Sequence, residues 1–376
     1  QVQGVASRVD GLTAFLGLPY AEPPVGPLRW KAPRPAAPWQ GVRRADAFGN
    51  RCIQTDPFPD MIWNSPAESE DCLYLSIWAP DGAQDLPVMV WIHGGGFLSG
   101  SGDEERHDGA VLASRDVLVV TINYRLGVLG FLAHPELTAE SGQKSSGNYA
   151  VLDMVAALRW VQDNIAAFGG DPDNVTIFGE SAGSFAVSTL MASPLAKGLF
   201  HRAIGQSGAQ FNDRGNHMVS LDDAEAQGER IAVAAGAESL AELRAATPGA
   251  LVAAAKKARA RFNPVVDGHV LPETPDAAFR AGRQNDVPLM AGWTSAETKW
   301  IRQSLSEFQA ERDRLFAGHE QQAARLYPAN SVAEAQRMAI TMASDTWIVF
   351  GTWKWMELQR KTGKSPVYRY LFDQVM

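Results

Sequence analysis

The residues best suited to chemistry are a serine between two glycines, in the sequence Gly-Glu-Ser-Ala-Gly at residues 179–183. A β-rich run at residues 174–178 precedes it, and small, helix-compatible residues at 184–191 follow it. A strand that turns through serine into a helix is a nucleophile elbow, because the flanking glycines permit the crowded turn that exposes the hydroxyl. An ordinary glycine loop is the alternative, and the flanking strand and helix disfavour it. The pattern predicts that Ser181 is a nucleophile.

A second glycine-rich motif, His-Gly-Gly-Gly-Phe at residues 93–97, follows an apolar run at residues 88–92. Glycine amides can approach a substrate oxygen closely and stabilise the negative charge that it gains during acyl transfer. We therefore assign an oxyanion hole to the backbone amides of Gly95, Gly96 and Ala182. A flexible glycine loop is the alternative, which the position of the motif after a buried strand disfavours.

The elements that must position these motifs alternate between strands and helices. Residues 116–125 have the apolar character of a buried strand, and residues 147–168 carry apolar side chains at helical spacing. Strand, helix and strand in this order predict a parallel βαβ unit, whose loops meet at one sheet edge. Residues 71–78 alternate with a period of two, which predicts a strand with one buried face. We expect an α/β-hydrolase fold: a mostly parallel central sheet with helices on both faces and the active site at one edge.

Composition and charge limit the functions open to this chain. Its 376 residues are 45% hydrophobic and 20% charged, and we expect a single domain over residues 1–376, with a helical excursion at about residues 222–261 covering the active-site edge. A formal net charge of −8 gives no basic surface for nucleic acid, and no apolar run is long enough to span a bilayer. Scattered histidines and a cysteine pair unlike a zinc site predict neither a metal nor another cofactor.

Several stretches together resemble the type-B carboxylesterases, the family that includes the cholinesterases and bacterial para-nitrobenzyl-type esterases. They extend over nearly the whole chain and are residues 15–21, 69–75, 93–97, 123–127, 166–172, 179–183 and 206–208. The resemblance implies a serine ester hydrolase that forms an acyl-enzyme on Ser181 and acts on small-molecule esters. A catalytically silent, cholinesterase-like adhesion protein is the alternative, but such proteins characteristically lack the nucleophile.

The resemblance also implies a triad of serine, glutamate and histidine. Glu297 follows an expected strand at residues 287–292, and the order of nucleophile and then acid is that of α/β-hydrolases, so Glu297 is our acid. Its neighbours differ from the family's Asp-Glu-Gly pattern. His319 is the only later histidine, and it lies at the start of an expected helix outside any strand-end loop. We therefore expect the general base downstream of Met376, in a C-terminal part that this chain lacks.

Two cysteines, Cys52 and Cys72, enclose a short loop. Spacing alone leaves a disulfide and two free thiols about equally favoured, and the family resemblance implies the disulfide. A disulfide is typical of an oxidising compartment, and the lack of a charged region followed by an apolar region at Gln1 fits a mature chain whose signal peptide has been removed. We expect a secreted or periplasmic protein.

Two aromatic side chains near these motifs have competing interpretations. Trp63 lies inside the cysteine loop and is similar to the cholinesterase tryptophan that contacts a quaternary ammonium group. Packing of the loop, or lining of an ester pocket, is the alternative. His93 precedes the nucleophile in the chain, and we interpret it as a hydrogen-bonding brace for the glycine loop rather than as a catalytic base.

Overall fold

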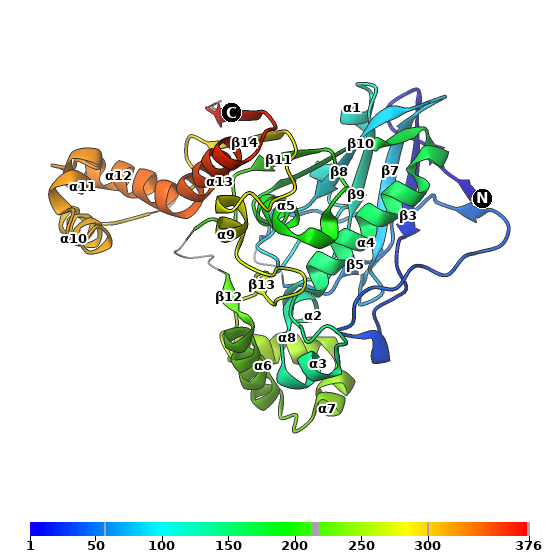
Figure 1. Ribbon diagram of the computed structural model, residues 1–376, viewed down its shortest axis with the longest axis horizontal. Coiled ribbons are helices and arrows are strands. Elements are labelled where there is room, and N and C mark those ends of the chain that lie inside the picture. The colour runs from blue at the N-terminus through cyan, green and yellow to red at the C-terminus, as the bar shows by residue number, and fades with distance from the viewer. Residues whose placement is uncertain (56–57, 213–217, 299–300, 374–376) are drawn as a thin grey trace.

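The fold is organised around a nine-stranded mixed sheet, in a computed structural model that describes residues 1–55, 58–212, 218–298 and 301–373 (Figure 1). From one edge to the other its strands are β15 (Val367–Phe372), β14 (Leu289–Thr294), β11 (Arg202–Gln206), β10 (Gly170–Glu180), β8 (Leu86–Ile92), β9 (Leu118–Ile122), β7 (Tyr74–Pro80), β3 (Leu12–Pro19) and β2 (Val5–Ala6). The strands from β15 to β9 pair in parallel, and the remaining three are antiparallel. The predicted mostly parallel sheet is confirmed.

Long helices cover one face of this sheet. They are α4 (Tyr149–Asn164), α5 (Ala182–Ala192) and α13 (Phe350–Thr362). Strand residues such as Val90 and Ile177 are fully buried in the core that they share with these helices. The helix expected from residue 147 therefore forms, and its last turn becomes a 3₁₀ segment, η3 (Ile165–Phe168), that ends at a left-handed glycine.

On the other face the short helix α1 (Ala110–Ala113) packs against β3, β7 and β9, and it forms a second cluster with Trp78 of β7. Leu75 and Ile77 of β7 enter the main core instead, so this strand is buried on both faces. This corrects the prediction of one buried face. The polar Ser76 is tolerated inside because its hydroxyl oxygen accepts a hydrogen bond from Gly17 N at 3.2 Å.

The helical excursion consists of α6 (Leu221–Ala235), α7 (Leu240–Ala245) and α8 (Pro248–Lys257), below the sheet in Figure 1. Each helix begins at a capping side chain, those of Ser220, Ser239 and Thr247. The Thr-Pro-Gly sequence near residue 248 is therefore a helix start, with proline at the first helical position.

The other elements are shorter or lie outside the sheet. The remaining helices are α2 (Gly127–Phe131), α3 (Pro135–Glu140), α9 (Pro275–Arg280) and the 3₁₀ turns η1 (Gly26–Leu28), η2 (Glu105–His107) and η4 (Pro194–Ala196). The two-residue strand pairs are β1 (Val2–Gln3) with β4 (Arg43–Arg44), β5 (Arg51–Cys52) with β6 (Glu68–Ser69), and β12 (Val219–Ser220) with β13 (Val265–Val266).

A helical arm projects from the body at the left of Figure 1. It contains α10 (Leu305–Leu315), α11 (Glu320–Leu326) and α12 (Val332–Ser344), and a π-helical turn, η5 (Asp345–Val349), joins it to α13. A separate small cluster around Phe308 holds the arm together. His319 is the residue before α11, so it lies at a helix start as predicted.

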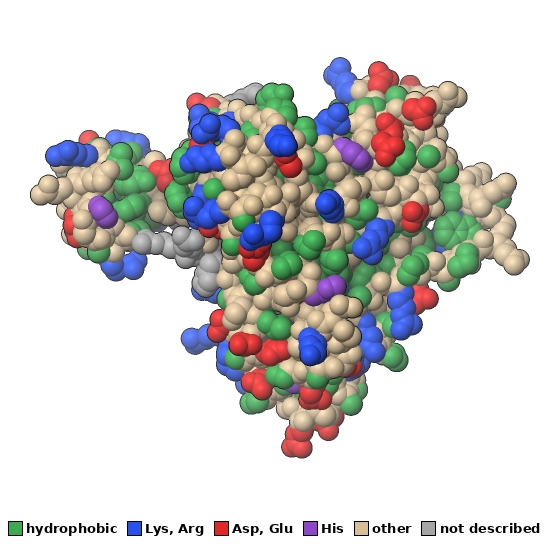
Figure 2. All heavy atoms as spheres, viewed as in Figure 1, with side chains coloured by type: hydrophobic (Ala, Val, Ile, Leu, Met, Phe, Trp, Pro, Cys, Tyr) green, Lys and Arg blue, Asp and Glu red, His purple; other side chains and the backbone are tan. Residues whose placement is uncertain are grey.

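The charge distribution on the surface and the apolar character of the helices are relevant to the partners that the protein can bind. Basic and acidic side chains are interspersed over the face shown in Figure 2. In the described part of the chain, no helix has both the length and the apolar character that crossing a membrane requires.

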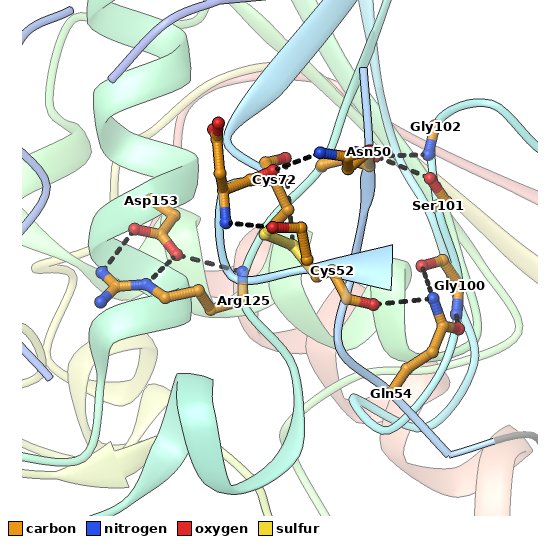
Figure 3. Close-up of a disulfide and its surroundings, with 12 residues drawn as sticks. Asn50, Cys52, Gln54, Cys72, Gly100, Ser101, Gly102, Arg125 and Asp153 are labelled. Carbon is orange, nitrogen blue, oxygen red and sulfur yellow. Dashed lines mark hydrogen bonds and ion pairs between the residues drawn. A yellow bond between two sulfur atoms is a disulfide. The ribbon is translucent and has the colours of Figure 1, made fainter. Parts of the chain in front are cut away.

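Cys52 and Cys72 form a disulfide, with their Cα atoms 4.9 Å apart, as the family resemblance implied (Figure 3). Both residues are buried, and Cys72 lies just before β7, so the bridge ties the intervening loop to the central sheet.

Replacing both cysteines by serine is expected to lower the free energy of unfolding by about 3 kcal/mol, because the unfolded loop regains conformational freedom. Urea denaturation of the wild type and the double variant measures the difference. Equal midpoints and slopes for the two proteins would show that the bridge contributes no stability.

Candidate active site

Ser181 occupies the turn between β10 and α5, with φ 52° and ψ −122°. A positive φ is unfavourable for a non-glycine residue and persists only where the surroundings impose it. Here the Ser181 amide donates to the Gln206 carbonyl oxygen, and the Phe185 amide donates to the Ser181 carbonyl oxygen, both at 2.9 Å. The structure places Ser181 at a strand-to-helix elbow, as the sequence predicts.

The glycines on either side of Glu180-Ser181-Ala182 are required by the close approach of β8. A Cβ atom on Gly183 would lie 2.0 Å from the Ile92 carbonyl oxygen, and one on Gly179 would lie 2.7 Å from the same atom. Both distances are far below normal contact, so any side chain would push β8 away from the elbow. The tight packing brings the end of β8 against Ser181.

The glycine loop after β8 lies at the same sheet edge as Ser181. Ile92 pairs with Gly179 in parallel register, and a Cβ atom on the following Gly94 would lie 3.2 Å from Ser181 Cβ. Gly95 and Gly96 have φ values of 106° and 65°, which favour glycine. Neither amide donates a backbone hydrogen bond to another described residue. The amide of Ala182 begins α5 and has no intrahelical partner.

His93 is buried beneath this loop and braces it. Its Nδ1 lies 2.9 Å from the Gly94 carbonyl oxygen, and its ring stacks on Tyr124 with centroids 4.2 Å apart. The Tyr124 hydroxyl donates to the His93 carbonyl oxygen at 2.7 Å. Burial lowers the pKa of His93 to about 3, so the ring stays neutral at ordinary pH. These contacts support the interpretation of His93 as a brace.

Glu297 follows β14, and polar groups from two neighbouring elements fix its carboxylate. Its Oε1 accepts hydrogen bonds from Ser207 Oγ at 2.7 Å and from Thr294 N at 2.6 Å. Its own amide donates to Ser344 Oγ at 3.2 Å. Because β11 lies between β10 and β14, Ser181, Ser207 and Glu297 follow consecutive strands of one edge.

Ser207 and Ser344 were not predicted as site residues. Ser207 belongs to the Gln-Ser-Gly stretch at residues 206–208, which contributes to the family resemblance but indicates no role for the serine. Its φ of 56° is a strained turn like that of Ser181, and no sequence pattern signals that its hydroxyl meets Glu297. Ser344 lies in the last turn of α12, where the sequence gives no sign of a contact with the acid loop.

Glu180 is a further functional candidate that the sequence reasoning missed. It precedes Ser181 in the elbow, and burial, followed by repulsion from Glu297, raises its pKa from 4.5 to about 7. By its surface area the residue is nevertheless exposed to solvent, and solvent screening reduces the size of the shift without reversing its direction. Its position next to Ser181 in the elbow motif is the feature of the sequence that could have identified it.

The raised pKa predicts a pH-dependent stability. Between about pH 4.5 and pH 7 the folded protein holds a proton on Glu180 that the unfolded chain releases, so this group stabilises the fold below that range and less as the pH rises. Glu180→Gln cannot titrate. The stability of the wild type relative to this variant should therefore fall from pH 5 to pH 8. Urea midpoints at the two pH values measure it, and an unchanged difference would contradict the raised pKa.

No described histidine hydrogen-bonds to Ser181 or Glu297. His107 lies 3.2 Å from Glu104, His134 accepts from the first turn of α3, and His319 lies in the arm. His217 lies outside the described residues. Ser181, the glycine loop at residues 94–96 and Glu297 thus lie at one sheet edge, and no described histidine hydrogen-bonds to Ser181 or Glu297.

Trp63 lies on the disulfide loop, where it forms an isolated β-bridge with Glu104. The guanidinium of Arg51 lies 5.6 Å from the centroid of the Trp63 ring. In the structure, therefore, Trp63 makes a cation–π contact with an arginine side chain of the same protein. Glu104 is also close enough to act electrostatically on Glu180, which places the bridge near the elbow.

The strand order and the serine at the turn after β10 define an α/β-hydrolase. The model of the carboxylesterase family matches residues 1–376, and the chain belongs to that family. It is 38% identical to fumonisin B1 esterase of Sphingopyxis macrogoltabida, over 100% of this chain and 70% of that protein. It is 41% identical to para-nitrobenzyl esterase of Bacillus subtilis, over 77% of this chain and 60% of that protein.

Solved structures agree with this assignment. A PNB esterase aligns with a TM-score of 0.84 at 36% identity, over 99% of this chain and 77% of its own. A carboxylesterase of Geobacillus stearothermophilus aligns with a TM-score of 0.83 at 37% identity, over 100% and 78% respectively. The chain spans only 60% to 70% of the length of the two curated relatives above.

Proposed function

We propose that the protein is a serine carboxylic ester hydrolase that forms an acyl-enzyme on Ser181. The observation that carries this proposal is the strained elbow, which holds the Ser181 hydroxyl beside backbone amides that have no hydrogen-bond partner among the described residues. Membership of the carboxylesterase family supports it. The catalytically silent alternative is not favoured, because such proteins characteristically lack the nucleophile, and the proposed nucleophile Ser181 is present in this chain.

In the proposed reaction, Ser181 Oγ attacks the ester carbonyl carbon while a histidine accepts the hydroxyl proton. The amides of Gly95, Gly96 and Ala182 donate to the resulting oxyanion. Collapse of the tetrahedral intermediate breaks the bond to the alcohol, which leaves with the proton from the histidine. Water, activated by the same histidine, then attacks the acyl-enzyme and releases the acid. Glu297 would orient the histidine and stabilise its charged form.

We place that histidine outside residues 1–376, as the sequence leads us to expect. Two observations support this placement: no described histidine reaches Ser181 or Glu297, and both curated relatives are longer than this chain. We further propose a single α/β-hydrolase domain in which the excursion α6 to α8 forms a wall of the active-site edge. Contact between α8 and α2 supports it, since α2 follows β9 at that edge.

The proposed substrates are small-molecule esters, in keeping with relatives named for fumonisin B1 and para-nitrobenzyl esters. We also propose a secreted or periplasmic location reached through a signal peptide, because a disulfide persists in oxidising compartments.

Intact mass measured before and after treatment with a fluorophosphonate tests the proposed function. One phosphonyl adduct on Ser181, together with hydrolysis of para-nitrophenyl acetate, is the expected result. A protein that neither takes up the label nor hydrolyses the ester would support the silent alternative. A mass above the 40.7 kDa of residues 1–376 is expected if the general base lies downstream.

Trp63 is our candidate for a substrate-pocket residue, either as a cation-binding ring or as an apolar wall. If the ring binds a substrate cation, Trp63→Ala should lower kcat/KM for a choline ester by roughly 5-fold to 30-fold relative to a neutral ester of equal acyl length. Steady-state kinetics on the two esters measure the ratio. Equal losses on both would exclude cation binding, and the Arg51 guanidinium over the ring favours that outcome.

A further inference from the structure

The oxyanion amides depend on the chain that follows them. The Gly95 carbonyl oxygen accepts hydrogen bonds from Leu98 N at 3.1 Å and from Ser99 N at 3.0 Å, which closes a tight turn. A Cβ atom on Gly95 would lie 2.2 Å from the Ser99 carbonyl oxygen. The turn and the segment 98–100 are therefore in direct contact. Any displacement of this segment moves the peptide groups of Gly95 and Gly96.

Gly100 extends this contact to the base of the loop. A Cβ atom on Gly100 would lie 2.2 Å from His93 Nδ1 and 2.4 Å from the Gly94 carbonyl oxygen. The peptide of Gly100 is thus packed against the residues that connect β8 to the oxyanion turn. Segment 98–100 is not part of a strand, so other groups must hold it in this position.

The disulfide loop supplies those groups, mainly through the side chain of Gln54 (Figure 3). Gln54 Oε1 accepts hydrogen bonds from Ser99 Oγ at 2.7 Å and from Gly100 N at 2.8 Å. Its Nε2 donates to the Gly100 carbonyl oxygen at 3.4 Å and to the Cys52 carbonyl oxygen at 3.1 Å. Next to it, Thr55 N donates to the Leu98 carbonyl oxygen at 3.0 Å.

The base of the loop is itself fixed to the central sheet. Cys52 is bonded to Cys72, two residues before β7. Asn123, which follows β9, donates to the Asn50 carbonyl oxygen at 3.2 Å and accepts from Gly102 N at 2.8 Å. Gln54 therefore projects from a loop that the disulfide and Asn123 both hold in place. Its amide oxygen accepts hydrogen bonds from segment 98–100, and its amide nitrogen donates one to it.

We propose that Gln54 is a positioning residue for the oxyanion hole, and that the Cys52–Cys72 disulfide fixes the backbone from which it acts. The inference rests on the proposed ester hydrolysis. The primary amide of Gln54 supplies both functions, because its oxygen accepts from Gly100 N and its nitrogen donates to the Gly100 carbonyl oxygen. In this role Gln54 acts through the backbone of segment 98–100. It sets the direction of the Gly95 and Gly96 amides, whose stabilisation of the oxyanion depends on their being preorganised.

Gln54→Ala in the full-length protein tests this inference. We expect kcat for para-nitrophenyl acetate to fall by roughly 10-fold to 100-fold, with KM within about threefold, because the misplaced amides matter most in the transition state. Affinity for a trifluoromethyl ketone, which forms a tetrahedral oxyanion adduct with the serine, should fall in parallel with kcat/KM. Each variant is assayed under conditions where it is fully folded. A loss of stability alone would then lower neither kcat/KM nor the affinity for the ketone.

Asn64→Ala is the matched control, because Asn64 ties the same disulfide loop to Asp103, with Nδ2 3.0 Å from the Asp103 carbonyl oxygen, and not to segment 98–100. It should retain the wild-type kcat and ketone affinity. Equal effects of the two variants would overturn the inference, as would a Gln54→Ala enzyme with kcat within threefold of the wild type.

Ser99→Ala provides a milder variant if Gln54→Ala does not fold. It removes the Ser99 Oγ bonds to Gln54 Oε1 and to Met61 Sδ and leaves the bonds between Gln54 and Gly100 in place, so kcat should fall by several-fold. An unchanged kcat and ketone affinity would contradict the inference. The wild type is assayed first. Absence of turnover and labelling there would contradict the proposed function itself, whereas normal wild-type turnover with variants whose kcat is unchanged contradicts only the role of Gln54.

Discussion

Ser181→Ala is expected to lower kcat for ester hydrolysis by roughly 10⁶-fold and to remove fluorophosphonate labelling. The reason is that the acyl-enzyme needs an oxygen nucleophile at the elbow, where the φ of 52° and the packing of β8 aim one side chain at the sheet edge. Alanine fits the same turn, so the fold should be retained. Initial rates on para-nitrophenyl acetate and intact mass after labelling measure the two effects.

Ser188→Ala is a suitable control for this experiment. Ser188 lies two turns further along α5, where its hydroxyl donates to the Phe185 carbonyl oxygen at 2.9 Å and is fully buried. We expect this variant to keep labelling and turnover. Labelling of Ser181→Ala at the wild-type rate would show that another residue is the nucleophile and would contradict the assignment of the elbow.

The elbow and the glycine loop could be predicted because their signals are local. The turn at Ser181 requires glycines at residues 179 and 183, because the Ile92 carbonyl oxygen approaches both residues closely. That requirement leaves a recognisable glycine motif in the sequence. The α/β fold could be predicted for a similar reason. Strand and helix periodicities alternate along residues 116–191, and parallel pairing then brings the strand ends to one edge.

The partners of the acid could not be predicted, because they are distant in the sequence. Ser207 Oγ and Glu297 Oε1 are 90 positions apart, and the strand order β10-β11-β14 alone brings them within 2.7 Å. Gln54 and Gly100 are 46 positions apart and meet through a loop with almost no regular structure. The two-sided burial of β7 depends likewise on α1, whose four residues carry no strong helical pattern.

Glu297→Gln is expected to lower kcat by roughly 10⁴-fold while leaving KM almost unchanged, if Glu297 is the acid of the triad as proposed. The structure explains why so small a change would matter. Glu297 Oε1 is already occupied by Ser207 Oγ and Thr294 N, so Oε2 is the oxygen that remains to accept from a histidine. Glutamine can keep both Oε1 bonds, but it then presents an NH₂ group where an acceptor is needed. The imidazole would be held in the wrong tautomer and its charged form would lose its partner.

Two comparison variants distinguish this explanation from a general loss of negative charge. Ser207→Ala removes one of the two Oε1 bonds and leaves the carboxylate in place, so we expect a loss of only about 10-fold in kcat. Glu180→Gln removes the neighbouring carboxyl, which lies in the elbow itself and whose pKa is raised in part by Glu297. Steady-state kinetics of the three variants on one ester decide between the carboxyls. If Glu180→Gln loses more activity than Glu297→Gln, the acid of the triad is not Glu297, and the histidine must be sought beside Glu180 instead.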